Sequence, residues 1–376
     1  MIGALSGIRI IEFAGLGPGP FCAMMLADHG AEIIRVDRIG GKNRTADPTL
    51  RSRKSIALNL KTLEGVGIAR ELVKSADGLI EGLRPGVMER LNLGPDELMK
   101  DNPKLVYGRM TGWGQNGPYA PVAGHDINYI ALAGALHSCG RAGDKPTPPV
   151  NLLGDFGGGG MMLAFGMVSA FLAIKNGAPG QVIDCAMTDG TAALMAGMWG
   201  LYADGLWKDE RGANLLDTGA HFYDTYETKD RKYISIGSIE PKFYALLLDK
   251  AGVSKDPEFE LQRDKDHWGT LSEKFTTVFK TKTRDEWCEI MEHTDVCFAP
   301  VLSLEEAPNH PHNIARNTFV KVDGKIQPAP APRLLVSGAV APVRAPNSGE
   351  DTKAVLKAMG YDNAAIEKFT SAGIVG

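Results

Sequence analysis

The segment from Ile8 to Asp37 constrains the fold of this chain more than any other part of the sequence. An apolar run at 8–14 precedes Gly-Leu-Gly-Pro-Gly-Pro at 15–20, a helical stretch at 21–29 and a second apolar run at 31–37. Strand, loop, helix and strand in this order form the unit from which parallel sheets are built. The sequence therefore predicts an α/β fold with a parallel sheet.

The same segment superficially resembles a dinucleotide-binding fingerprint, with Asp37 near the position of the acid that contacts the ribose. The third glycine of that fingerprint falls on Pro20, however. Pro18 and Pro20 both lack the N–H group that faces a pyrophosphate. The sequence therefore disfavours a nicotinamide-dependent dehydrogenase.

Strand and helix signals continue to about residue 205. They predict helices at 63–74, near 91, at 161–175 and at 189–205, and strands at 78–81, 105–110 and 181–187. We divide the chain into a large α/β domain at 1–205, a linker at 206–225, a smaller α+β domain at 226–319, a Pro-rich return linker at 320–345, and C-terminal helices at 346–376 that pack back on the large domain.

Composition excludes several classes of protein. A net charge of −4 over 376 residues gives no global electrostatic case for nucleic acid or an anionic membrane as partner. No apolar run reaches ~18 residues, so we predict no membrane span. The five cysteines form no C-x-x-C pair, which predicts reduced thiols in a cytoplasmic protein, without a disulfide frame or a metal site.

A local excess of positive charge stands out between residues 35 and 61. Eight basic side chains face two acids there, Asp37 and Asp47. Arginine and lysine in such density suit a phosphate-bearing small ligand, and Arg84 and Arg90 extend the set. A solvated basic surface explains the same composition, so both interpretations stay open at this point.

The residues best suited to chemistry lie between Gly124 and Gly160. His125 and Asp155 each sit in a glycine-framed turn, and two bases of different kinds suit an enzyme that moves a proton at carbon. The glycines let backbone approach a substrate and leave N–H groups for a developing negative charge. The alternatives are a structural histidine and an N-cap aspartate. Glu240 follows a predicted strand directly, where a helix cap is the alternative role.

Several motifs together resemble the family III CoA transferases and, within that superfamily, the α-methylacyl-CoA racemases. The segments that carry the resemblance begin at Leu5, Gly30, Glu81, Met110, Gly124, Gly154, Gly237 and Leu356. Transferases of this family use an aspartate as nucleophile, and Asp155 lies at the matching position. The racemases add the histidine of Gly-His-Asp-Ile-Asn-Tyr and the glutamate of Gly-x-Ile-Glu-Pro, which are His125 and Glu240 here.

The resemblance implies a reaction and a mechanism. The enzyme would interconvert the (2R) and (2S) forms of 2-methylacyl-CoA thioesters through an enolate. His125 and Asp155 would serve as the two acid/bases, one on each face of the planar intermediate, and Glu240 would orient the imidazole. The acyl-CoA thioester is the substrate, and neither a metal nor a redox cofactor is expected.

The resemblance also implies an architecture and a binding site. A Rossmann-like large domain built from both termini, together with the small domain, would form an interlocked homodimer. The CoA moiety would be held by Arg38, Leu58, Asn59, Leu60, Lys61, Gly82, Leu83, Arg84, Arg90, Gly124, His125, Asp126, Ile127, Asn128 and Tyr129. A CoA transferase acting through Asp155 and an acyl-CoA-binding protein without catalysis remain as alternatives, and the preferred acyl chain stays open.

Overall fold

The computed structural model describes residues 3–376, which form two compact units. Unit 1 contains the residues up to Ala133 together with Val150–Leu194 and His312–Gly376; unit 2 contains Gly134–Pro149 and Met195–Pro311. Unit 1 therefore combines both ends of the chain, and unit 2 is inserted between them. These units are defined by contacts, and the predicted domain bounds stay predictions.

A six-stranded parallel sheet forms the centre of unit 1, which confirms the predicted α/β fold. Its strands lie in the order β3-β2-β1-β4-β5-β6. The strand bounds are β1 Arg9–Phe13, β2 Glu32–Asp37, β3 Arg53–Ala57, β4 Gly78–Glu81, β5 Val106–Thr111 and β6 Gln181–Ala186. The order changes direction between β1 and β4, as in doubly wound folds, where ligands bind beyond the carboxyl ends of the strands.

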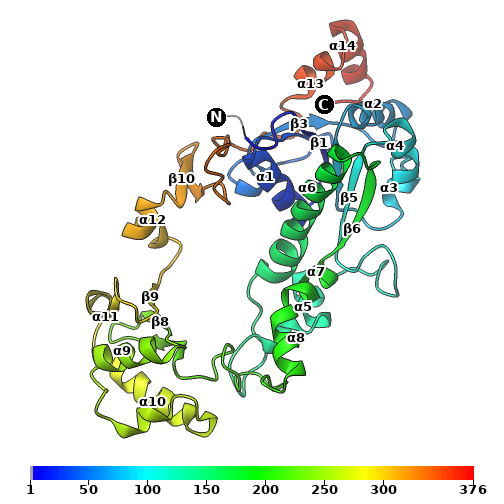
Figure 1. Ribbon diagram of the computed structural model, residues 1–376. Coiled ribbons are helices and arrows are strands. Elements are labelled where there is room, and N and C mark those ends of the chain that lie inside the picture. The colour runs from blue at the N-terminus through cyan, green and yellow to red at the C-terminus, as the bar shows by residue number, and fades with distance from the viewer. Residues whose placement is uncertain (1–2) are drawn as a thin grey trace. The chain divides into compact units, whose positions relative to one another are not determined.

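Helices cover both faces of this sheet, so its strands are mostly apolar on both sides. Figure 1 shows α1 (Pro18–Asp28) and α6 (Met162–Lys175) on one side, and α2 (Leu63–Lys74) and α4 (Pro95–Asp101) on the other. Two separate apolar clusters result, one beneath each helix layer. The remaining helices of this unit are α3 (Val87–Arg90), α5 (Asp126–Leu132), α7 (Met187–Leu194), α12 (Pro311–Ala315), α13 (Thr352–Ala358) and α14 (Asn363–Ser371), with short turns η1 (Pro48–Leu50) and η3 (Leu152–Met161).

Several elements differ from the sequence predictions. β3 was missed because Arg53 and Lys54 make its sequence polar. The hairpin of β10 (Phe319–Val322) and β11 (Lys325–Pro328) occupies part of the predicted linker. Its turn is Asp323-Gly324, with both residues at positive φ, a strong hairpin signal. The predicted helix at 189–205 is two helices, α7 and α8 (Ala196–Ala203).

The continuous helical stretch Leu152–Lys175 is long and apolar enough to cross a membrane, by length and composition alone. It consists of η3 and α6, which pack against β5, β6, α1 and α7. A helix that covers a sheet meets the same criterion, so this is weak evidence for a span. Its outward side remains apolar, with Phe165 74% and Leu172 58% exposed.

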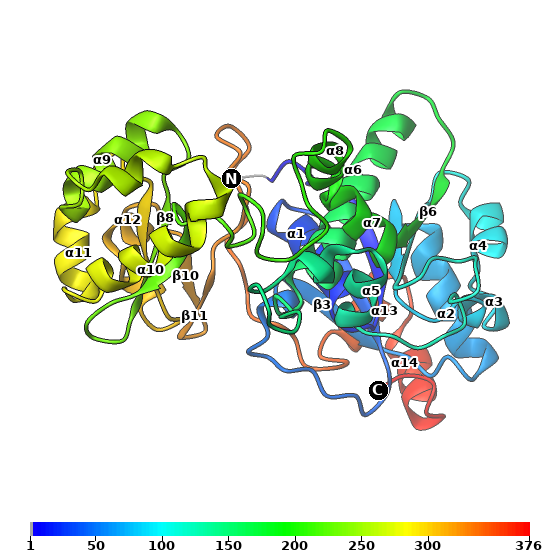
Figure 2. The same cartoon turned by 90° about the horizontal axis from the view of Figure 1, so that it is seen from below.

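Unit 2 is a small α+β unit built on a three-stranded antiparallel sheet of β7 (Tyr223–Glu227), β8 (Tyr233–Gly237) and β9 (Phe298–Val301). Figure 2 shows three of its helices on one side of β8, namely α9 (Pro241–Ala251), α10 (Trp268–Phe279) and α11 (Arg284–Met291). Aromatic side chains fill the core between helices and sheet. The short turns are η2 (Ala135–Ser138), η4 (Pro257–Leu261), η5 (Lys265–His267) and η6 (Ala307–Asn309).

Candidate active site

The predicted binding segments of unit 1 all follow the carboxyl ends of parallel strands. Arg38 follows β2, the segment 58–61 follows β3, and the segment 82–84 follows β4. The loop after β5 leads to Gly124 and α5. Because the carboxyl ends of parallel strands lie at one edge of a sheet, segments far apart in sequence share that edge. This edge includes the switch point between β1 and β4.

Asp155 lies in η3, a π-helical stretch with a wider turn than an α-helix. Its carboxylate accepts a hydrogen bond from the Asn151 side chain, with Nδ2 and Oδ2 2.9 Å apart. The loop after β1 passes close by, since a Cβ on Gly17 would lie only 2.8 Å from Asp155 Oδ2. Gly17 also has a φ of +64°, so glycine suits this position on both counts. No motif in the sequence indicates this contact of Asn151.

His125 precedes α5 and is exposed. Its backbone N–H donates to the side chain of Asn128 at 3.0 Å, which fixes the start of the helix. The next residue, Asp126, is buried, and its Oδ1 accepts the backbone N–H of Asp155 at 2.7 Å. The two predicted bases therefore belong to neighbouring turns that are joined through Asp126.

The surroundings of Asp155 favour its protonated form. Burial raises the pKa of Asp155 above the ordinary range, and the charge of Asp126 adds to the rise. The hydrogen bond from Asn151 and the charge of His125 oppose it. Tyr129 responds to the same field, since burial and the carboxylates of Asp155 and Asp126 raise its pKa. A carboxyl group with a raised pKa is better suited to accept and return a proton.

The glycines after Asp155 have a different role from the one predicted. A Cβ on Gly158 would lie 2.7 Å from the backbone nitrogen of Thr191, and one on Gly190 would lie 1.9 Å from the carbonyl oxygen of Gly158. These glycines bring η3 against α7 backbone to backbone. Gly158 and Gly190 are buried. Here the glycines serve close packing within the protein, and this fixes the turn that carries Asp155.

The predicted CoA residues differ in exposure. Leu58 is 1% exposed and its backbone pairs with Val375, so its side chain is not available to a ligand. Asp126 and Tyr129 are also buried. The exposed members of the set are Arg38, Lys61, Gly82, Arg84, Arg90, His125, Ile127 and Asn128, and the partly exposed ones are Asn59, Leu60, Leu83 and Gly124.

The basic stretch at 35–61 contains two kinds of cation. Arg35, Arg51 and Arg53 are buried in ion pairs with acids of the sheet and of α1. Arg44 and Lys54 pair with acids at the surface. Within the described part of the chain, the exposed cations of this stretch without a salt bridge are Arg38, Lys42 and Lys61. Counting the basic residues of this stretch overestimated how many are available to a ligand. The acids that pair with the buried arginines are distant in sequence, so the stretch itself does not show them.

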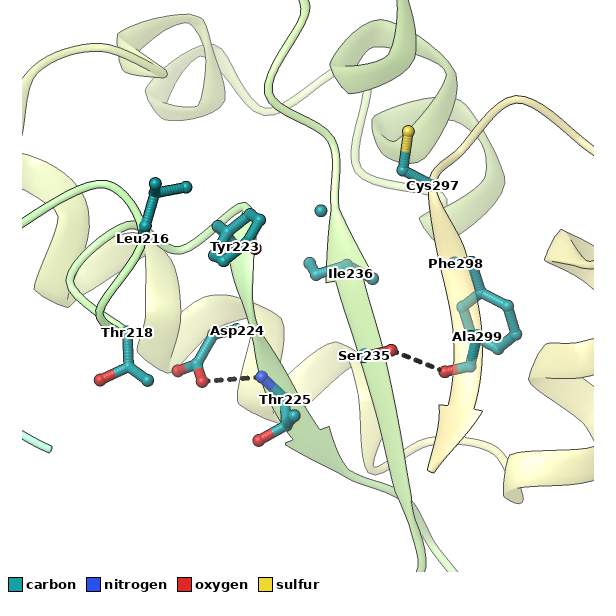
Figure 3. Close-up of a pocket in the computed structure, with 11 residues that line it drawn as sticks. Leu216, Thr218, Tyr223, Asp224, Thr225, Ser235, Ile236, Cys297, Phe298 and Ala299 are labelled. Atoms are coloured by element: carbon teal, nitrogen blue, oxygen red, sulfur yellow. Dashed lines mark hydrogen bonds between the residues drawn. The ribbon is translucent and has the colours of Figure 1, made fainter. Parts of the chain in front are cut away.

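Glu240 belongs to unit 2, where it is exposed and precedes α9. Its charge reaches Cys297, because burial and then the Glu240 carboxylate raise the pKa of that thiol. Cys297 borders a cavity of about 480 Å³ on the strands β7, β8 and β9, which Tyr223 and Phe298 also line. Figure 3 shows this cavity, with the Ser235 hydroxyl donating to the Ala299 carbonyl across it.

Fold and site together define a doubly wound α/β protein whose polar residues gather at the carboxyl edge of the sheet. A family model described as CoA-transferase family III matches residues 5–352. The chain belongs to this family. It is 47% identical to the α-methylacyl-CoA racemase of Mus musculus and 44% identical to that of Homo sapiens, and each alignment covers 99% of this chain and 97% of the relative.

A solved structure supports the fold assignment. The crystal structure of a CAIB/BAIF family protein from Brucella suis superposes with a TM-score of 0.83. The alignment covers 96% of this chain and all of that chain, at 23% sequence identity. At this identity the likeness concerns the fold, which agrees with the one described above.

Proposed function

We propose that this chain is a racemase that interconverts the (2R) and (2S) forms of 2-methylacyl-CoA thioesters by 1,1-proton transfer. The observation that carries the proposal is its similarity to curated α-methylacyl-CoA racemases over nearly the whole length of both chains. His125 and Asp155, in turns joined through Asp126, supply an imidazole and a carboxyl group of raised pKa.

The reaction requires two bases on opposite faces of the substrate. One base removes the α-proton and leaves a planar enolate of the thioester, and the conjugate acid of the other base returns a proton to the opposite face. His125 and Asp155 take these roles. Glu240 accepts the second imidazole N–H of His125 and stabilises the imidazolium, as carboxylates do for other catalytic histidines. The proton balance closes without a metal or a redox cofactor.

The CoA moiety lies at the carboxyl edge of the sheet in this proposal. Exposed cations without a salt bridge, Arg38 and Lys61 among them, face its phosphates, and Arg84 and Arg90 contribute from the loop and helix after β4. Backbone groups at 58–60, 82–83 and 124–129 line the same edge. Guanidinium groups donate paired hydrogen bonds to phosphate, which explains why the proposal relies on arginine.

The active protein is an interlocked homodimer in this proposal, in which the small domain of one chain completes the site of the other. The exposed apolar side of α6 supports it, because large apolar surfaces of this kind are covered in assemblies. α8 has no buried residue, and Trp199 on it is 61% exposed. Sedimentation should give twice the mass of the chain. The five free cysteines agree with a reducing, cytoplasmic location.

The decisive experiment follows the α-carbon of a single enantiomer of a 2-methylacyl-CoA in D₂O, with no second acid added. Wild-type protein should epimerise it and incorporate deuterium at the α-position. His125→Ala and Asp155→Ala should each lower the rate by roughly 10²–10⁴-fold. His137→Ala removes an exposed histidine of unit 2 and serves as the control.

The same experiment tests the transferase alternative. An unchanged α-carbon, with CoA moving only when an acceptor acid is supplied, would make Asp155 a nucleophile. Hydroxylamine would then trap an acyl-enzyme intermediate, and His125→Ala would retain activity. Binding of acyl-CoA without either reaction would indicate an acyl-CoA-binding protein without catalysis.

A further inference from the structure

Asp126 is a buried acidic residue that joins the turns of the two proposed bases. It follows His125 directly and is the first residue of α5, yet its side chain is 6% exposed. A first-turn aspartate commonly faces solvent or caps its own helix. Here the carboxylate instead reaches η3, where it contacts the residues around Asp155.

The contact is close and specific. Oδ1 of Asp126 accepts the backbone N–H of Asp155 at 2.7 Å. A Cβ on Gly154 would lie 2.5 Å from the same oxygen, so a side chain there would displace the carboxylate. The glycine of the Gly-Asp motif thus leaves room for Asp126. The second oxygen, Oδ2, is buried and has no hydrogen-bond partner among residues 3–376.

An unpartnered, buried carboxylate oxygen costs folding free energy. An asparagine amide can supply the same acceptor to the Asp155 N–H without a buried charge, so the hydrogen bond alone does not require an acid here. We therefore expect the negative charge of Asp126 to act on a neighbouring titratable group. Asp155 and Tyr129 are titratable neighbours on which this charge acts.

We propose that Asp126 is a positioning residue that holds the backbone of Asp155 at a fixed place relative to His125 and places a buried negative charge beside the Asp155 carboxyl group. The inference rests on the proposed racemase function, because a nucleophilic aspartate would need the opposite electrostatic setting. Asp126 does not exchange a proton with the substrate.

The electrostatic part follows from the groups that face Asp155. Burial, then the charge of Asp126, raises the pKa of Asp155, while the Asn151 amide and the His125 charge lower it. Tyr129, buried on α5, carries no charge near pH 7, because the ordinary pKa of tyrosine is about 10 and burial raises it further. Removing the charge of Asp126 while keeping its shape should therefore lower the pKa of Asp155.

Two substitutions separate the hydrogen bond from the charge. Asp126→Asn keeps an oxygen for the Asp155 N–H, whereas Asp126→Ala removes both oxygen and charge. With a 2-methylacyl-CoA substrate, Asp126→Asn should leave KM within about twofold and move the acidic limb of the kcat/KM profile down by roughly 0.5–2 pH units. Asp126→Ala should lower kcat by at least roughly tenfold at the pH optimum, since misplacing a base by less than 1 Å has this effect.

A matched control is available within the same sheet. Asp184 in β6 also accepts a backbone N–H, that of Gln115 at 3.1 Å, but is exposed. Asp184→Asn should leave the pH profile unchanged. Circular dichroism and thermal unfolding verify that each variant is folded.

A second readout does not depend on activity. Carboxyl ¹³C resonances of aspartate-labelled protein, with Asp155 assigned by Asp155→Asn, report its pKa directly. A lower pKa of Asp155 in Asp126→Asn supports the proposal, even if the wild-type protein fails to exchange the α-proton and the racemase function falls. An unchanged Asp155 pKa, or equal activities of Asp126→Asn and Asp126→Ala, would overturn it and leave Asp126 as a helix cap.

Discussion

The strongest test of the physical account of the fold is the replacement of Glu12 by glutamine. Glu12 lies in β1 and is 0% exposed, and its two carboxylate oxygens contact Arg35 at 2.5 Å and Arg53 at 2.6 Å. Arg35 also pairs with Asp37 at 3.1 Å, so two anions and two cations balance within the sheet. Glu12→Gln leaves one positive charge buried without compensation.

The expected cost follows from burial. Breaking a buried ion pair by removing one partner typically costs about 3–5 kcal/mol, because the remaining charge stays desolvated. Glu32 on the neighbouring strand provides the matched control. It too contacts two cations, Arg9 and Lys54, both at 2.7 Å, but its side chain is 34% exposed. Glu32→Gln should cost at most about 1 kcal/mol, since solvent screens exposed pairs.

Hydrogen exchange followed by mass spectrometry measures this cost locally, because amides of β1 report the opening of unit 1. In Glu12→Gln, exchange of the segment 9–13 should accelerate roughly 10²–10⁴-fold, against less than about tenfold in Glu32→Gln. Adding Arg53→Met to Glu12→Gln removes the uncompensated cation and should recover part of the loss. Equal exchange in the two single variants would refute the reasoning.

Two further substitutions test the site and its surroundings. Gly17→Ala should lower kcat by roughly tenfold or more in the racemisation assay, because the new Cβ would lie 2.8 Å from Asp155 Oδ2. The control is Gly7→Ala, where φ is +91° and no atom lies within 4 Å of the added Cβ. This variant should leave kcat unchanged. Burial raises the pKa of Glu81 to about 7, so the folded state holds its proton while the unfolded state loses it near pH 4.5. The free energy of unfolding should therefore fall by up to about 3 kcal/mol as pH rises from about 4.5 to 7. Glu81→Gln should remove this pH-dependent contribution, as measured by urea unfolding at pH 5 and 7.5. The same pH dependence in the wild-type protein and the variant would contradict the raised pKa of Glu81.

The parallel sheet could be predicted because local patterns encode it. Apolar runs and Gly-Pro punctuation marked β1, α1 and β2 without reference to the rest of the chain. The strand β3 escaped prediction because its Arg53 is compensated by Glu12, 41 positions earlier in the sequence. A charged residue can be assigned to a buried strand only when the residue that balances its charge is known.

The candidate site was predictable at the level of motifs and less so at the level of side-chain direction. The glycine-framed turns drew attention to His125 and Asp155, and the structure joins these two turns through Asp126. Neither spacing nor composition indicates that Asp126 points inward, or that Asn151 contacts the Asp155 carboxylate. Both contacts depend on the π-helical turn of η3, whose wider spacing a helical pattern does not specify.

The glycine run after Asp155 links the packing of unit 1 to its chemistry. Because Gly158 and Gly190 meet backbone to backbone, no side-chain rearrangement can accommodate a Cβ between η3 and α7. Any added methyl group must move one of the two helices, and η3 carries Asp155. For the proposed proton transfer, Asp155 must be held within roughly 0.5 Å of its productive position, so we expect this contact to affect turnover more than CoA binding. The close approach of Gly158 and Gly190 would then hold the proposed base in place.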